Sequence, residues 1–345
     1  MAERFTQLSK SVYFDPAFRD FSHRTAGAIC HVLSHFDDYP EELVRQFEKQ
    51  VWRVMQFVRG SRSNDAPHET QFVLRTALRH WIDEEALVSS AALEDFNFFL
   101  NTEDVWDFIN RSLNHFDSED YKPLVVRIGS PEVYKHRPVF CIPLFHELGH
   151  FVDHYFEISK TSFFLAPPAA PPQGISRDNW NFINLRHRME HFADIFSACH
   201  CGEASYKSLL AIAPNNQDSP THPATSKRVE VVSDFLSSTP NTMVALLQKA
   251  CSIRTGKELE ARFSNPNIEA SFDDVLTYEI KDDSELFGIF LAGWEYLDTQ
   301  INDRTASWID GNITISGIEK TVNDLVEKSI RNYEIKERWV HGTSD

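Results

Sequence analysis

The sequence IPLFHELGHFVDHYF, at residues 142–156, carries the strongest structural signal in this chain of 345 residues. Apolar residues occupy most of its positions, which predicts a buried helix, and Pro143 falls in the first turn, where a helix tolerates proline. Within it, HELGH at 146–150 places His146 and His150 four residues apart, on one face of the helix. Both imidazoles can therefore bind one metal ion, and this histidine spacing is that of zinc sites.

Glu147 follows the first of these histidines, which places its carboxylate beside the water that a bound metal would hold. A carboxylate there can take a proton, so we expect Glu147 to act as the general base on a zinc-bound water. Gly149 has no side chain, so the backbone of a neighbouring element can approach the helix closely at this position. Together these features predict a hydrolytic zinc centre.

A catalytic zinc centre also needs a third protein ligand and an open position for water. The extended motif HExxHxxGxxH is excluded, because Asp153 and Phe156 stand where that motif has glycine and histidine. His154 lies two helical turns beyond His146, about 12 Å along the axis, so we expect it to be a structural histidine. The remaining option is a carboxylate on a later helix.

The sequence EHFAD at 190–194 supplies such a carboxylate. Glu190 and Asp194 are one turn apart and share a face of a helix. We expect Glu190 to ligate zinc and Asp194 to accept the free N–H of a zinc-bound histidine, which fixes the tautomer of that imidazole and raises its basicity. The alternative is that both carboxylates form the solvated face of an amphipathic helix.

In combining HELGH with EHFAD, the chain resembles the glutamate-zincin metallopeptidases (gluzincins), which join HExxH to a downstream ExxxD on a second helix. The sequence THPATSKRV at 221–229 is similar to an element of one such family, that of the prenyl-protein protease and the heat-shock membrane protease. Over residues 123–230, the resemblance implies a mostly helical zincin core that hydrolyses peptide bonds with Zn²⁺ as its cofactor. Those relatives carry membrane-spanning helices, whereas no window here approaches ~18 consecutive apolar residues, so membrane substrates are not implied.

The resemblance also implies candidates for stabilising the oxyanion of peptide hydrolysis, a charge that needs a partner besides the metal. These catalytic candidates are His222 and Arg228. Each has another explanation. His222 precedes a proline and could cap the next helix, while Arg228 could be a surface charge or a partner for Asp194.

Two other segments bear on the site. PLVVRI at 123–128 is rich in β-branched residues and predicts a short strand that ends at the turn signal of 129–131. Its position just before the metal helix favours an edge strand that pairs with an extended substrate, or else a structural strand inside a small sheet. APPAAPPQG at 166–174 holds four prolines and a glycine, so it predicts a loop or flap between two helices.

The chain as a whole is expected to be mostly α with a small β-sheet (α+β), a zincin-like core flanked by helical regions. We expect a helical N-terminal region at 1–118, the catalytic core at 119–230 and a helical C-terminal region at 231–345. Apolar residues recur at three and four from 11 to 114, with polar breaks at 61–68 and 114–122. Further helices are expected at 142–156, 181–201, 229–236, 243–253, 285–297 and 318–333, with a break at 214–225.

Composition narrows the choice of partners and of compartment. A formal net charge of -17 argues against a nucleic-acid partner, since phosphate binding is driven by Lys and Arg. Neither a secretory signal nor a membrane span is predicted, and five cysteines at irregular spacing do not form a disulfide framework, so we expect a cytoplasmic protein. Cys199-His200-Cys201 has the wrong spacing for a second zinc site, and Cys141 is expected to be buried and structural.

These features support a soluble zinc metalloendopeptidase, a hydrolase whose substrate is a protein or peptide. A different hypothesis is a regulatory module with a zincin fold that acts through a partner protein, bound by the flanking helical regions. A third is a metal-dependent hydrolase with a substrate other than a peptide. The aromatic segments 96–100 and 294–297 could face such a partner, although core packing is the commoner use of these residues.

Overall fold

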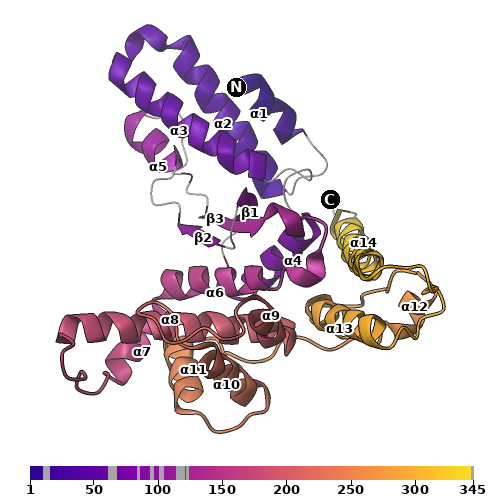
Figure 1. Cartoon of the computed structure of the whole chain (residues 1–345). Helices are drawn as coiled ribbons and strands as arrows, with labels where there is room; N and C mark the ends of the chain where they lie inside the picture. The colour runs from indigo at the N-terminus through magenta and orange to yellow at the C-terminus, as the bar shows by residue number, and fades with distance from the viewer. Residues whose placement is uncertain are drawn as a thin grey trace.

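A computed structural model describes residues 1–10, 16–60, 68–83, 86–93, 97–100, 105–113, 121 and 124–342 of the chain. The fold is mostly α-helical with one small β-sheet, which confirms the predicted fold class (Figure 1). Its helices and strands are α1 (Ala2–Ser9), α2 (Pro16–Ser34), α3 (Glu41–Gly60), α4 (His68–Arg79), β1 (Ala86–Leu93), β2 (Asn97–Leu100), α5 (Val105–Ser112), β3 (Leu124–Pro131), α6 (Pro143–Phe156), α7 (Ile158–Leu165), α8 (Arg177–Cys201), α9 (Ala204–Ile212), α10 (Thr225–Leu236), α11 (Thr242–Thr255), α12 (Glu269–Asp273), α13 (Asp283–Asn302) and α14 (Ile315–Gly342).

The sheet has three strands in the order β1-β3-β2. β3 runs parallel to β1, with Ala86 opposite Leu124, and antiparallel to β2, with Phe98 opposite Ile128. The predicted strand therefore exists from residue 124 onward, but it is the central strand. The prediction of an edge strand that aligns a substrate is wrong, because β1 and β2 occupy both of its sides.

Two other predictions fail in this region. Residues 86–93 and 97–100 form strands, although a helical region was expected from 11 to 114, broken only by the loop at 61–68. The sequence ALVSSAAL of β1 is rich in small residues with little β preference, so pairing with β3 decides its conformation rather than local propensity. The predicted turn at 129–131 belongs to β3, whose last residues still pair with β1.

The sheet separates two buried cores. Side chains of a strand alternate between its faces. Leu87 and Val125 pack into the core that α1, α2, α3 and α5 form, whereas Ala86 and Val126 pack into a larger core with α4, α6, α8, α11, α13 and α14. In Figure 1, α1 to α3 and α5 lie on one side of the sheet and α6 lies on the other. Helices from 68–79 and from 231–345 thus share one core with the region 119–230.

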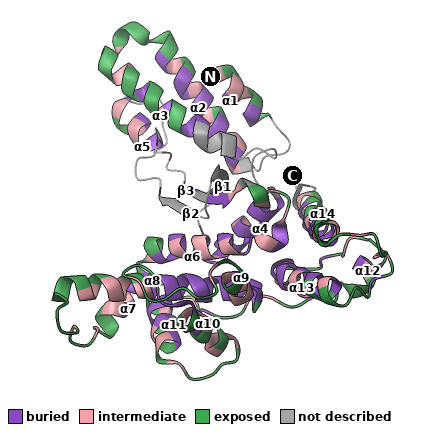
Figure 2. Ribbon diagram, viewed as in Figure 1, coloured by how far each residue is buried: buried purple, intermediate pink, exposed green. Residues whose placement is uncertain are grey.

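α8 is the central helix of the larger core. Its residues from Glu190 to Cys201 are all buried, while most of its first half is exposed or half-buried (Figure 2). The exposed end begins at Ser176, whose side chain accepts a hydrogen bond from the backbone N–H of Asn179. Glu190 therefore lies where α8 enters the core.

α6 packs against the buried half of α8 at Gly149. A Cβ atom added to Gly149 would lie 2.9 Å from Ala193 Cα and 3.0 Å from Phe196 Cβ, closer than unbonded carbon atoms normally approach. The two backbones meet there with no side chain between them, as predicted from Gly149. This contact sets the distance across which the polar side chains of α6 and α8 face each other.

The remaining predicted segments agree with the structure where it describes them. The helices expected at 142–156, 181–201, 229–236, 243–253, 285–297 and 318–333 are present as α6, α8, α10, α11, α13 and α14. Tyr296 and Leu297 are buried in the larger core, so this aromatic segment is used for packing. Residues 97–100 form β2, but their side chains lie outside the described part of the chain, as do residues 61–67 and most of 114–122.

The proline-rich segment 166–174 is a loop between α7 and α8, as predicted. Arg177 and Trp180, in the first turn of α8, each donate a hydrogen bond of 3.0 Å to the carbonyl oxygen of Ala169. Glu190 is ten residues beyond Trp180, about 15 Å along the helix axis. The loop is therefore held at the end of α8 that lies away from Glu190.

All five cysteines are free. Among the described residues, none of the helices combines the length and the apolar character that crossing a bilayer requires.

Gly149→Ala is expected to destabilise the protein by about 1–3 kcal/mol, because the added methyl group must push α6 and α8 apart in a packed core. Urea unfolding followed by circular dichroism measures this change. Gly311→Ala is the matched control, since a Cβ there meets nothing within 4 Å. Equal stability of the two variants would show that the contact at Gly149 is not tight.

Candidate metal centre

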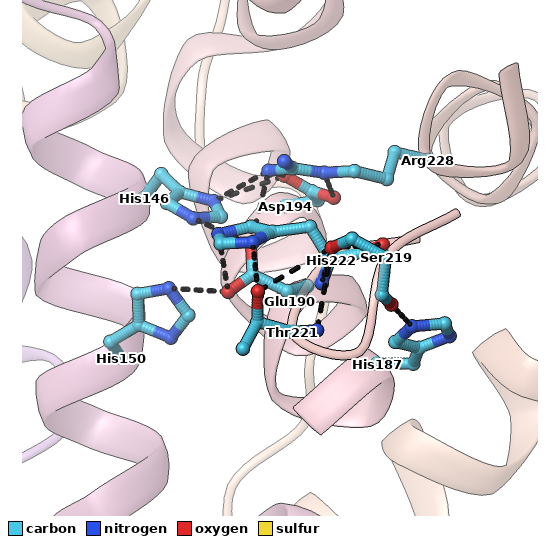
Figure 3. Close-up of polar contacts among 9 residues, drawn as sticks. All are labelled: His146, His150, His187, Glu190, Asp194, Ser219, Thr221, His222 and Arg228. Carbon is cyan, nitrogen blue, oxygen red and sulfur yellow. Dashed lines mark hydrogen bonds and ion pairs between the residues drawn. The ribbon is translucent and has the colours of Figure 1, made fainter. Parts of the chain in front are cut away.

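The residues singled out in the sequence come together from α6 and α8, which belong to the larger core, and from α10 and the loop before it. Figure 3 shows all of them except Glu147. They are His146, Glu147 and His150 on α6, Glu190 and Asp194 on α8, His222 in the loop before α10, and Arg228 on α10.

The carboxylate of Glu190 faces both histidines of α6. His146 Nε2 lies 3.4 Å from Glu190 Oε2, and His150 Nε2 lies 3.4 Å from Glu190 Oε1. One candidate ligand atom from each residue lies within 4.8 Å of the other two. Zinc bonds of about 2.0–2.2 Å at tetrahedral angles place two ligand atoms about 3.4 Å apart. The two distances from Glu190 to the histidines match this value, and the three side chains are close enough together to hold one ion.

The three candidate ligand side chains are largely buried, which favours a bound cation over a solvated cluster of charges. The side chains of His146, His150 and Glu190 are 15%, 16% and 9% exposed. Among the described residues, none hydrogen-bonds to the buried Oε2 atom of Glu190, whose nearest cationic neighbours are His146 at 3.4 Å and Arg228 at 3.5 Å. A buried carboxylate oxygen without a hydrogen-bond donor is costly unless a cation offsets its charge. Two imidazole nitrogens and this oxygen fit a divalent ion such as zinc.

Asp194 lies against the other nitrogen of His146. Its Oδ1 atom is 3.0 Å from His146 Nδ1, and both of its oxygens accept hydrogen bonds from Arg228, at 2.7 Å from Nε and 2.6 Å from Nη2. A neutral imidazole carries one proton, so a proton held on Nδ1 by Asp194 leaves Nε2 unprotonated toward Glu190. Arg228 is 12% exposed and thus a partner of Asp194 rather than a surface charge.

Burial and charge pairing act in opposite directions on the pKa values of this cluster. Burial lowers the pKa of His146, but the neighbouring carboxylates of Asp194 and Glu190 outweigh it and raise that pKa to about 10. Burial raises the pKa values of both carboxylates. His146 and His150 nevertheless hold the pKa of Glu190 well below its usual range, and Arg228 does the same for the pKa of Asp194. Both carboxylates are ionised at neutral pH, and in the metal-free protein His146 is protonated.

His222 stands at the rim of this cluster. Its Nε2 atom is 3.6 Å from Glu190 Oε1, its side chain is 57% exposed, and its Nδ1 atom is hydrogen-bonded to Thr221 Oγ1 at 2.9 Å. The N-cap of α10 is Ala224, and no side chain caps this helix, so His222 is not a helix cap. The side chain instead extends over the Glu190 carboxylate (Figure 3).

The loop that carries His222 is anchored by residues that sequence reasoning missed. His187 Nε2 donates to the carbonyl oxygen of Ser219 at 2.7 Å, and Asp218 Oδ1 accepts from the backbone N–H of Ala224 at 2.7 Å. The only signal for His187 is its position one turn before Glu190 on the same helix. Its partner is a backbone atom distant in sequence, which a side-chain pattern does not indicate.

Glu147 opens onto a cavity of about 300 Å³ beside the ligands. His146, Glu190, His222 and Arg228 line the same cavity. Glu147 therefore lines the same space as two of the candidate ligands, His146 and Glu190, as a general base acting on a water at the metal requires.

Other histidines and cysteines considered in the sequence lie elsewhere. His154 is exposed and does not belong to the ligand group. Cys199, His200 and Cys201 are buried in the larger core, where His200 Nδ1 donates to the carbonyl oxygen of Phe196 at 2.9 Å. Cys141 is also buried, which raises the pKa of its thiol to about 12.

Comparison of the chain with protein-family models, with curated proteins and with solved structures finds no match. The resemblance to the glutamate zincins therefore rests on the motifs alone. The function inferred below rests on the geometry of the site.

Purified wild-type protein is expected to hold about one zinc ion per chain, and His146→Ala and Glu190→Ala to lose it, because two protein ligands are too few for a stable zinc site. Elemental analysis of dialysed protein measures the content. His154→Ala on the same helix is the matched control and is expected to keep the metal. Full zinc content in Glu190→Ala would contradict the three-ligand assignment.

Metal affinity is expected to fall as the pH falls. Since the pKa of His146 is about 10 in the metal-free protein, an entering ion must displace its proton. Between roughly pH 9 and pH 6, the association constant should therefore decrease by about tenfold per pH unit for that proton. Competition with a chromophoric chelator measures the constant. An affinity independent of pH over this range would show that His146 is not a ligand.

Proposed function

We propose that this protein is a zinc-dependent peptidase. The observation that carries the proposal is the convergence of His146, His150 and Glu190, whose candidate ligand atoms lie within 4.8 Å of one another. Glu147 adds a carboxylate that lines the cavity beside them. A ligand set next to a free carboxylate and an open space is the arrangement that metal-assisted hydrolysis needs.

The two histidines and one carboxylate are also compatible with a second kind of metal site. Two histidines and one carboxylate also bind iron in non-haem oxygenases. Glu147 favours hydrolysis, because an oxygenase has no use for a general base beside its metal, whereas hydrolysis requires a group that removes a proton from water. The elemental analysis described above also distinguishes zinc from iron.

The division of labour among the residues follows from their positions. A zinc ion held there supplies Lewis acidity, which polarises a carbonyl group and acidifies water at neutral pH. Glu147 takes the proton of the attacking water and returns it to the leaving amine. Asp194 holds His146 in the tautomer whose Nε2 atom faces Glu190.

His222 and Arg228 have different roles in this proposal. His222 reaches over the Glu190 carboxylate from an exposed loop, so its Nε2–H can donate to the oxyanion that forms on the substrate. Arg228 uses Nε and Nη2 on Asp194 and acts through that carboxylate, which it keeps ionised and oriented. Arg228 is therefore a positioning residue.

Glu147→Gln is expected to keep its zinc and to lose peptide hydrolysis by about 10²–10⁴-fold, because the amide cannot accept the proton of water. Mass spectrometry of a mixture of random decapeptides, incubated with zinc-loaded protein, measures the cleavage. Glu230→Gln on α10 is the matched control, since this glutamate is exposed and lines no part of the cavity.

The same experiment separates the proposed function from its alternatives. Cleavage by wild type and Glu230→Gln, but not by Glu147→Gln, supports the peptidase. Equal cleavage by all three proteins would exclude Glu147 as the base. Zinc binding without any peptide cleavage by the wild type would contradict the peptidase and favour either the regulatory module that acts through a partner protein or a hydrolase with a substrate other than a peptide.

A further inference from the structure

His222 stands over the Glu190 carboxylate on a loop that is mostly open to solvent. Its side chain is 57% exposed, and its Nε2 atom lies 3.6 Å from Glu190 Oε1. Packing does little to fix a side chain so exposed, so hydrogen bonds must hold it. The requirement is strict, because a shift of about 1 Å in a group that contacts the transition state can slow a reaction by about 10²-fold. The contacts that hold this loop therefore bear on the rate.

Ser219 fixes His222 within the loop. The backbone N–H of Ser219 donates to the carbonyl oxygen of His222 at 2.9 Å, and the Ser219 hydroxyl accepts from the backbone N–H of His222 at 2.9 Å. Thr221 Oγ1 is hydrogen-bonded to His222 Nδ1 at 2.9 Å, which holds the ring itself (Figure 3). A hydroxyl that donates to Nδ1 leaves the ring proton on Nε2, the atom that faces Glu190. The backbone and the imidazole of His222 therefore move with Ser219.

His187 ties Ser219 to α8. Its Nε2 atom donates to the carbonyl oxygen of Ser219 at 2.7 Å, and the residue is half-buried. His187 lies three residues before Glu190 on the same helix, about 4.5 Å along the axis. Figure 3 shows the resulting path, from His187 through Ser219 to His222 and on to Glu190. The loop and the carboxylate beneath it are thus held by neighbouring turns of one helix.

Asp218 holds the same loop to a different helix. One of its oxygens accepts from the backbone N–H of Ala224 at 2.7 Å, and the other pairs with Lys227 on α10. These contacts close the loop onto the start of α10 and do not involve α8. His187 holds the loop from the helix that carries Glu190, so its contact bears directly on where the loop lies relative to that carboxylate.

We propose that His187 is a positioning residue for peptide hydrolysis. Through the carbonyl oxygen of Ser219 it holds His222 where the Nε2–H of that imidazole meets the oxyanion of the substrate. His187 itself does not line the cavity, so it acts without touching the substrate. The proposal rests on the peptidase function and adds to it a residue on which the rate depends but metal binding does not.

Kinetics of the zinc-loaded full-length protein test this role, with a peptide that the wild type cleaves in the mixture described above. His187→Ala is expected to lower kcat about tenfold and to leave KM nearly unchanged, because the oxyanion is absent from the bound substrate. His187→Gln should recover most of this loss, since its amide N–H can donate to the same carbonyl oxygen. His154→Ala is the matched control and should keep the wild-type rate. Zinc content should be that of the wild type in all three variants.

A double-mutant cycle shows whether His187 acts through His222. His222→Ala removes the oxyanion donor, which is expected to lower kcat by about 10²–10³-fold. In that background, His187→Ala should cause no further loss, because the side chain that it positions is gone. Independent losses that multiply would show that His187 supports the fold rather than His222, and would overturn the proposal.

Hydrogen exchange gives a readout that does not require turnover. The hydrogen-bonded amides of Ser219 and His222 exchange slowly only while the loop stays closed. His187→Ala should therefore accelerate exchange across 214–222 and leave 190–201 unchanged, whereas His187→Gln should stay close to the wild type. Mass spectrometry of peptic fragments of the zinc-loaded protein measures both segments.

The remaining outcomes separate this proposal from the peptidase function. An unchanged kcat in His187→Ala, beside a loss in Glu147→Gln, would overturn the positioning role and leave the peptidase intact. Faster exchange of 190–201 in His187→Ala, or a failure of His187→Gln to recover kcat, would overturn it in the same way. Absence of cleavage by a zinc-loaded wild type would overturn the peptidase and this proposal together.

Discussion

The candidate metal centre depends on the contact of two helix backbones at Gly149 and Ala193. Because no side chain separates α6 from α8 there, the histidines of one helix reach the carboxylate of the other at 3.4 Å. His150 is adjacent to Gly149, and Asp194 is adjacent to Ala193. The backbone contact and the polar side chains thus lie in the same helical turns of α6 and α8. The distance between the candidate ligands is therefore determined by how the two backbones pack rather than by flexible side chains.

The second constraint is the cost of burying charge. Asp194 and Glu190 are removed from water by the core around α8, and an isolated carboxylate in that position would be strongly unfavourable. Arg228 offsets the charge of Asp194 through two hydrogen bonds. Glu190 has no comparable partner at Oε2 among the described residues. The negative charge of Asp194 is therefore balanced by Arg228. The charge on Oε2 of Glu190, which faces His146, has no hydrogen-bond donor to balance it among the described residues.

The sequence predicts this site better than it predicts the fold around it. HELGH and EHFAD each place two polar residues on one helical face, because a helical repeat is a local property that spacing alone determines. The pairing of β1 and β2 with β3 depends on contacts between segments distant in sequence, and the small residues of β1 carry little preference of their own. The anchoring of the His222 loop by His187 is equally non-local, since it uses a backbone carbonyl. The central position of β3 could not be predicted for the same reason.

The division of α8 into an exposed half and a buried half has a consequence for how the chain can vary. Residues 177–186, where the proline-rich loop docks on Arg177 and Trp180, are exposed or half-buried. Insertions or changes of composition there would leave the register of residues 190–201 unaltered, because that register is held by the surrounding core. The sequence and length of this exposed segment of α8 and its loop can therefore change, or the segment can acquire a binding role, while the part of the helix that carries Glu190 and Asp194 stays in place.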